Sequence, residues 1–147
     1  MENKEGAYLK GVYEIKVYDR FGNLKDYEEK ANLITNAGFK GLAQASADLG
    51  SQLPFKFVAM GTSTTAAAAG DTALTAEITA GGCARISGTA TTDTTTVASD
   101  TLKITHQFSA TASLAVNEVG IFDSSASGTM LSRTVLGATK NLTSGDT

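Results

Sequence analysis

Residues 116–136 constrain the fold of this chain most, because they contain its clearest hairpin signal. Two apolar-rich runs, residues 116–122 and 130–136, flank a loop of small, turn-forming residues at 123–128. Regular alternation of the first run gives one face Val119 and Ile121 and the other face Val116, Gly120 and Phe122. A strand with two apolar faces is typical of a position between two packed layers, so the hairpin predicts a β-sandwich.

Alternating patterns in the rest of the chain predict further strands. Residues 9–19 and 24–31 form an N-terminal hairpin with one polar face, closed by a turn at Gly22 and Asn23. Residues 55–60 and 102–108 alternate in the same way, and Gly81-Gly82 opens another expected strand through Arg85, Ile86 and Thr89. We therefore expect a mainly β chain, with residues 1–147 in a single antiparallel β-sandwich of jelly-roll or immunoglobulin-like type. Residues 1–7 are expected to form an extended N-terminal arm.

One helix is predicted, over residues 36–49. Thr35 or Asn36 supplies the N-cap and Gly50 the C-terminal stop. Its expected buried stripe consists of residues at helical spacing, namely Phe39, Leu42, Ala43, Ser46 and Leu49.

The middle of the chain has two interpretations. Thirteen threonines fall between residues 62 and 101, which is typical either of strands with long loops or of a disordered linker. We favour strands with long loops, because apolar anchors recur at Leu74, Ile78, Ile86 and Val97. The Gly-Thr-Ser-Thr-Thr run from residue 61 lacks the lysine of a phosphate-binding loop, so no nucleotide or other cofactor is expected.

The residues that carry catalytic chemistry are too few for an enzyme. Cys83 is the only cysteine and is expected to be a small buried hydrophobe. His106 is the only histidine and is expected to be a hydrogen-bonded core residue. Glu118 lies on an otherwise apolar strand, where a buried ion pair with Arg133 is favoured over an acid of glycoside hydrolysis. We expect no enzymatic activity and no metal site.

The charge pattern argues against two classes of partner. The formal net charge is −3, with no basic stripe for nucleic acid, and no run approaches the roughly 20 apolar residues of a membrane span. The chain closes on a turn signal at residues 144–146 followed by Thr147. Either one more strand follows or the end is extended and pairs with a neighbouring chain.

Three stretches of the sequence resemble small structural proteins of tailed bacteriophages. They are NLITNAGFKGLA at residues 32–43, FVAMGTSTTAAAAGDTALTAEI at 57–78 and NEVGIFDSSASGTMLSRTVL at 117–136. Such sequences are similar to capsid decoration proteins and to N-terminal modules of tail fibres. The resemblance implies a β-sandwich component of the virion that assembles with copies of itself.

Of the two roles, we favour a capsid decoration, or cement, protein that binds the major capsid protein on the outer head surface and bridges capsomers. The alternative is a tail-fibre or receptor-binding adhesion module, and an enzyme acting on surface glycans comes third. Resemblance to decoration proteins at local three-fold positions implies a homotrimer. The expected interface combines tyrosines of the charged N-terminal segment with the uncharged loop: Tyr8, Tyr13, Tyr18, Thr62, Thr64, Thr65 and Leu74.

Overall fold

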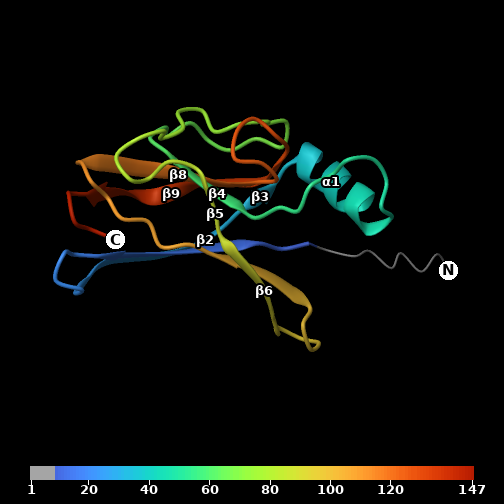
Figure 1. Cartoon of the computed structure of the whole chain (residues 1–147), viewed down its shortest axis with the longest axis horizontal. Helices are drawn as coiled ribbons and strands as arrows, with labels where there is room; N and C mark the ends of the chain where they lie inside the picture. The colour runs from blue at the N-terminus through green and yellow to red at the C-terminus, as the bar shows by residue number, and fades with distance from the viewer. Residues whose placement is uncertain (1–8) are drawn as a thin grey trace.

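The computed structural model describes residues 9–147, which form nine strands and one helix (Figure 1). In chain order these are β1 (Val12–Tyr18), β2 (Leu24–Ala31), β3 (Leu33–Ile34), α1 (Asn36–Ser46), β4 (Phe57–Gly61), β5 (Ile86–Ser87), β6 (Thr89–Asp93), β7 (Thr101–Thr105), β8 (Leu114–Phe122) and β9 (Met130–Leu142). All strand pairs are antiparallel. The predicted fold class, mainly β with one short helix, is confirmed. The predicted arm at residues 1–7 lies outside the described residues.

A five-stranded sheet in the order β3-β9-β8-β4-β5 forms the centre of the molecule. Its central strand β8 and the neighbouring strand β9 are the hairpin predicted from the sequence. The connecting loop is closed by Asp123, whose carboxylate accepts a hydrogen bond from the Thr129 amide at 2.7 Å. Gly128 lies in this loop with φ +77°, a left-handed conformation that suits glycine.

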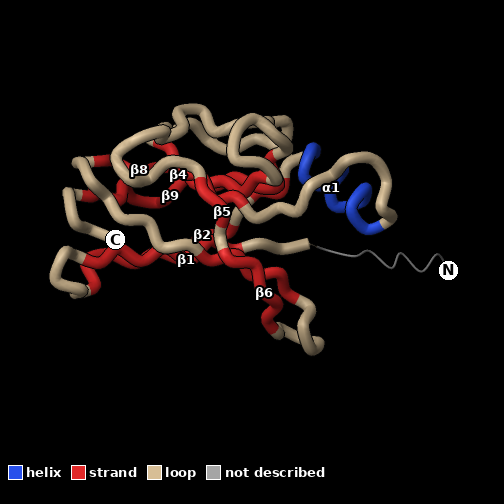
Figure 2. The backbone as a smooth tube through the Cα atoms, in the orientation of Figure 1, coloured by secondary structure: helices blue, strands red, loops and turns tan. Residues whose placement is uncertain are grey.

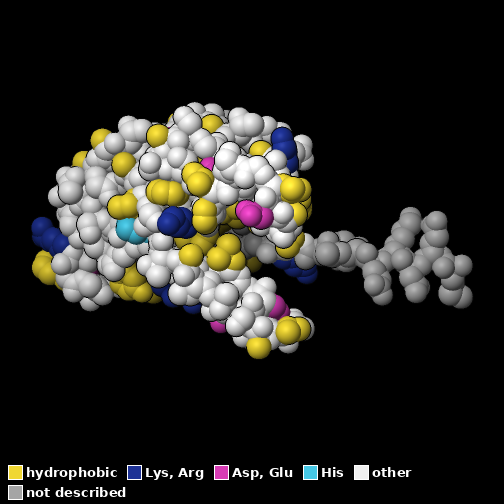
Figure 3. Space-filling view, turned by 45° about the vertical axis from the view of Figure 1, so that its right-hand side comes forward, with side chains coloured by type: hydrophobic (Ala, Val, Ile, Leu, Met, Phe, Trp, Pro, Cys, Tyr) yellow, Lys and Arg dark blue, Asp and Glu magenta, His cyan; other side chains and the backbone are white. Residues whose placement is uncertain are grey.

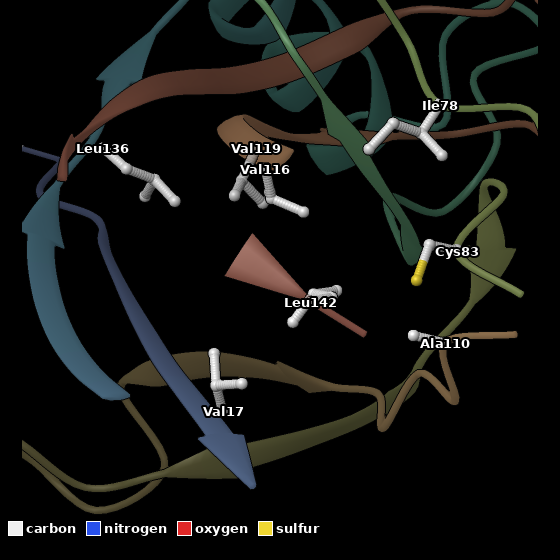
Figure 4. Close-up of a cluster of buried hydrophobic side chains, with 8 residues drawn as sticks. All are labelled: Val17, Ile78, Cys83, Ala110, Val116, Val119, Leu136 and Leu142. Atoms are coloured by element: carbon white, nitrogen blue, oxygen red, sulfur yellow. The ribbon is translucent and has the colours of Figure 1, made fainter. Parts of the chain in front are cut away.

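The β1–β2 hairpin covers one face of this sheet. Val17 of β1 packs with Val116, Val119 and Leu142 in the larger of two apolar clusters (Figure 4). Polar contacts add to this packing, since the buried ammonium of Lys140 on β9 lies 3.2 Å from Asp26 and 2.9 Å from Glu28 on β2. Sheet and hairpin are therefore two packed antiparallel layers, as a β-sandwich requires.

The threonine-rich segment after β4 covers the opposite face (Figure 2). Its Leu74 packs with Ala59, Phe122 and Met130 in the second apolar cluster. Backbone hydrogen bonds hold its ends, with the Thr62 amide donating to the Ala76 carbonyl and the Ile78 amide to the Met60 carbonyl, both at 2.8 Å. Over residues 62–78 the segment is thus an ordered loop, as we favoured, and not a linker.

The structure corrects the predicted alternation of β8. Val116 and Val119 share one apolar cluster, although regular alternation placed them on opposite faces. The reason is an irregularity in the ladder: Val116 pairs with Lys140, whereas Glu118 pairs with Val135, so four residues of β9 lie opposite Asn117.

The helix also differs from its prediction. Its N-cap is Thr35 as expected, but α1 ends at Ser46, because Asp48 adopts φ +50° and the Leu49 amide turns back to the Gln44 carbonyl at 2.9 Å. Phe39 is 49% exposed, and the buried positions are Gly38 and Gly41. A Cβ at Gly38 would clash with the Leu131 carbonyl, so the helix contacts the sheet through its backbone and not through the predicted apolar stripe.

Two further predictions concern the single cysteine and the single histidine of the chain. Cys83 is fully buried in the larger apolar cluster, as expected. His106 is not a core residue: β7 ends at Thr105, and the half-buried His106 ring lies edge-on to Phe108, with ring centroids 4.6 Å apart. The sequence pattern extended this strand by three residues because the alternation continues through Phe108.

Thr35 provides a test of how α1 is attached to the sheet. Its fully buried hydroxyl accepts a hydrogen bond from the Gly38 amide at 2.9 Å and donates to the Met130 carbonyl at 2.5 Å. Thr35→Ala removes both bonds and should lower the free energy of unfolding by about 1–3 kcal/mol, measured by urea denaturation. The exposed neighbour provides the control, since Asn36→Ala should change stability by less than about 0.5 kcal/mol. Equal losses in both variants would contradict this role of Thr35.

Candidate interaction surface

A buried ion network lies between β8, β9 and the loop at residues 62–78. The Arg133 side chain is 1% exposed and that of Glu118 is 0% exposed. Arg133 donates from Nε and Nη2 to Glu118 Oε2, at 2.8 and 2.7 Å, and from Nη1 to Asp71 Oδ2 at 2.7 Å. The predicted Glu118–Arg133 pair is therefore confirmed. It is diagonal across the ladder, because Arg133 lies opposite Gly120.

The remaining hydrogen bonds of this network go to the loop itself. Arg133 donates to the carbonyls of Thr65 and Ala66, at 2.8 and 3.3 Å, and to the Thr75 hydroxyl at 3.1 Å. Glu118 accepts hydrogen bonds from the amides of Thr75 and Ala76, at 3.2 and 2.8 Å. The network thus binds mainly the loop backbone, which leaves side chains on the outer side of the loop available to solvent.

The mutual contacts shift two pKa values in the direction that keeps the network charged. Burial lowers the pKa of Arg133, but hydrogen bonds to Glu118 and Asp71 outweigh burial and leave that pKa raised. The pKa of Asp71 lies below its ordinary value, because its carboxylate accepts a hydrogen bond from the Ala68 amide and lies beside Arg133. Both groups therefore stay ionised near neutral pH.

A second ion pair, between Arg85 and Glu77, fixes the end of the loop. Arg85 donates to both carboxylate oxygens of Glu77, at 2.8 and 2.5 Å, and its guanidinium lies 3.5 Å from the centre of the Phe122 ring. Asp71 and Glu77 are the only charged residues between positions 57 and 84. Because both pair with internal arginines, the outer surface of the loop carries small uncharged side chains.

Some of the predicted interface residues are exposed in the structure and others are buried. Thr62, Thr64 and Thr65 are exposed together on the loop. Leu74 is only 7% exposed, so its side chain belongs to the core, contrary to its expected place at an interface.

The three tyrosines differ from one another in their surroundings. Tyr13 points its hydroxyl inward to the Ser132 hydroxyl at 2.8 Å, and burial raises the pKa of its phenol. Tyr18 is half-buried and its backbone pairs with that of Thr147, at 2.8 and 2.9 Å, so the end of this sequence pairs within its own chain. Tyr8 lies outside the described residues.

Sequence reasoning missed the buried cations other than Arg133. Arg85 and Lys140 carry side chains that are almost fully buried. Arg85 pairs with Glu77, eight residues earlier in the chain, whereas Lys140 pairs with Asp26 and Glu28 of the β1–β2 hairpin. The scarcity of charge around Glu77 was the one available signal for Arg85. No sequence signal indicated the burial of Lys140, because its partners depend on how the β1–β2 hairpin packs on the sheet.

Exposed apolar side chains gather at other places on the chain. They lie in the β1–β2 turn and at the start of β2 (Phe21, Leu24), after α1 (Leu49, Leu53) and in the β6–β7 hairpin (Val97, Leu102). Figure 3 shows such side chains on the projecting β6–β7 hairpin and on the adjoining body. Over residues 9–147, no group of three or more histidine, cysteine or acidic side chains is arranged to hold a metal ion. In the same part of the chain, α1 lacks the length and apolar character needed to cross a bilayer.

Comparison with known proteins assigns the chain to a protein family. Residues 30–147 match the model of the family described as podophage GP4 fiber I protein gp80. The chain belongs to this family. The match includes the sheet, α1, the loop and the ion network, whereas β1 and most of β2 precede it. No curated protein and no solved structure matches the chain.

Membership of the gp80 family makes the chain a structural component of a phage virion. The resemblance to tailed-phage structural proteins is thereby confirmed at this level. Because the family is one of fibre proteins, it favours the tail-fibre alternative over the capsid decoration role.

The ion network predicts a large effect for a small change. Glu118→Gln leaves a buried guanidinium with Asp71 as its one remaining carboxylate and should lower the free energy of unfolding by about 3 kcal/mol, measured in urea. Glu14→Gln is the matched control, since the Glu14–Lys16 pair is exposed and its loss should leave the free energy of unfolding almost unchanged. Adding Arg133→Met to Glu118→Gln should cost less than the two single losses summed. A Glu118 variant as stable as the Glu14 variant would contradict the network.

Asp71 predicts how stability depends on pH. Its folded pKa is below the ordinary value of about 3.9, so its ionised form stabilises the protein above that pH, and this contribution is lost as pH falls through the folded pKa. The difference in unfolding free energy between the wild type and Asp71→Asn should therefore shrink between about pH 6 and pH 3. A difference that stays constant over this range would show that the Asp71 charge does not stabilise the loop.

Proposed function

We propose that this chain is a structural module of a podophage tail fibre that assembles with copies of itself and has no enzymatic role. The observation that carries the proposal is the gp80-family match over residues 30–147. A fibre module needs a stable body and an adhesive surface, and the following features of the described residues suit both.

The loop at residues 62–78 has the properties of a contact surface. Thr62, Thr64 and Thr65 are exposed, and the alanines and glycine that follow add no charge. Small uncharged side chains lose little on desolvation and allow another backbone to approach closely. Arg133 fixes this loop by hydrogen bonds to its carbonyl groups, so the conformation of the loop is set before any contact forms. This lowers the entropy cost of binding.

The carboxylate that most suggested catalysis, that of Glu118, is already occupied by hydrogen bonds within the protein. Glu118 is fully buried and accepts hydrogen bonds from Arg133, Thr75 and Ala76, which leaves it poorly placed to meet a glycan. We infer that its role is structural. We also propose that the chain needs no cofactor and has neither nucleic acid nor membrane as a partner.

The oligomer we propose is a homotrimer. Its basis is the resemblance to phage decoration proteins at local three-fold positions, together with the general preference of homo-oligomers for closed symmetry. The major capsid protein is a partner only if the chain is a decoration protein, and no contact within the described residues favours that role.

The test compares virions with and without this protein. Deleting its gene should abolish adsorption to host cells and leave the heads as resistant to heat and low salt as before. Gold-labelled antibodies against the purified protein should mark the tail fibres on intact virions. Labelled heads, with head stability lost and adsorption kept, would instead establish capsid decoration with the major capsid protein as partner.

A further inference from the structure

A pocket lies where two turns meet at one end of the molecule (Figure 1). The β1–β2 turn and the start of β2 form one side, within residues 19–25, and the turn after β9 forms the other, within residues 143–146. Backbone hydrogen bonds between Tyr18 and Thr147, at 2.8 and 2.9 Å, hold the two sides together. The pocket volume of about 690 Å³ lies within the range of small-ligand sites, roughly 300–1,000 Å³.

The two carboxylates that line this pocket are engaged within the protein. Asp19 accepts hydrogen bonds from the amides of Phe21 and Asn23, at 2.8 and 2.9 Å, and thereby fixes the β1–β2 turn. Asp146 is 3% exposed, and its Oδ2 lies 2.6 Å from Lys25 Nζ. The charge of Asp146 is therefore balanced by Lys25, and that of Asp19 is stabilised by backbone amides.

The two cations of the pocket keep hydrogen-bond donors for a ligand. Lys25 uses two of its three ammonium protons, on Asp146 and on the Asn141 carbonyl at 3.1 Å, and its side chain is 39% exposed. Arg20 is exposed, and within residues 9–147 its guanidinium has no ion-pair partner. The Phe21 ring positions this guanidinium, which lies 4.9 Å from the ring centre. The pocket thus offers donors to a negatively charged group.

Two further groups of the pocket select among negatively charged ligands. Phe21 is 76% exposed, so its ring presents an apolar surface to a ligand although Arg20 lies beside it. Every hydrogen bond that Asp146 accepts from the described residues goes to Oδ2, which leaves Oδ1 without a donor there. This second oxygen can accept a hydrogen bond from a ligand hydroxyl.

Together these groups define a class of ligand. A small inorganic anion would pair with Arg20 and leave the Phe21 ring and the Asp146 oxygen unused, and a neutral apolar ligand would leave the cations unused. A carboxylated sugar uses all of them. Its carboxylate pairs with a guanidinium, the C–H face of its ring packs on an aromatic side chain, and its hydroxyls donate to a carboxylate.

We propose that this pocket binds a carboxylated sugar unit of a surface polysaccharide, with the carboxylate at Arg20 and Lys25 and the sugar ring on Phe21. The site follows from its own residues. Only the source of the sugar, the surface of the host cell, rests on the proposed tail-fibre role. Binding at this pocket gives a structural module of the fibre a part in recognising the cell.

Nuclear magnetic resonance titration of the isotope-labelled full-length protein tests the site. The carboxylated probes are the methyl glycosides of glucuronic, galacturonic and sialic acid. Methyl glucoside and methyl galactoside are matched controls, because they have the rings of the two uronic acids and lack only the carboxylate. Inorganic phosphate is the control that carries charge without a ring.

We expect at least one carboxylated glycoside to shift the amides of residues 20–25 and 143–146, and to bind about fivefold or more tightly than the neutral glycosides and phosphate. Arg20→Gln and Phe21→Ala should each weaken that binding by about fivefold or more. Lys40→Gln and Phe39→Ala are the matched control variants, since they remove an exposed cation and an exposed ring from α1 and should leave binding unchanged.

The sugar site is wrong if none of the three carboxylated glycosides shifts these amides, if phosphate binds as tightly as they do, or if Arg20→Gln and Phe21→Ala bind like the wild type. A fibre location shown by antibody labelling would still stand in each case. Sugar binding by a protein that labels the heads would instead keep the site and contradict the fibre role.

Discussion

The structure depends on a buried arginine that needs partners. Arg133 lies on β9, beside the central strand β8, at 1% exposure, and a buried guanidinium is tolerated only where carboxylates and carbonyls surround it. Glu118 supplies one partner from the neighbouring strand. Asp71 and the carbonyls of Thr65 and Ala66 supply the others from a loop more than sixty residues away. The loop is therefore fixed by electrostatics as much as by apolar packing.

The three sequence stretches that resemble phage proteins contact one another in the structure. Thr35 and Gly38, from the first stretch, bring α1 against the carbonyls of Met130 and Leu131 in the third. Asp71, from the second, meets Glu118 and Arg133 of the third. The three stretches therefore form one three-dimensional unit, in which the first and the second stretch both bind to the third.

Sequence reasoning succeeded where signals are local. The β8–β9 hairpin follows from alternation around a turn, the Thr35 N-cap from its position before the helix, and the Glu118–Arg133 pair from opposite charges on facing apolar strands. It failed where backbones meet, since Gly38 contacts the sheet without a side chain and Phe39 faces outward. The irregular pairing after Val116 and the burial of Lys140 depend on distant segments of the chain. An alternating sequence pattern contains no information about such contacts.

The central claim is that the ion network makes the loop at residues 62–78 part of the core. Native-state hydrogen exchange of the Thr75 and Ala76 amides tests it most directly, because both donate to the Glu118 carboxylate. If the claim is right, these amides exchange as slowly as those of β8, through unfolding of the whole sheet. Fast exchange of both amides beside a protected β8 would show that the loop opens independently and would contradict the account.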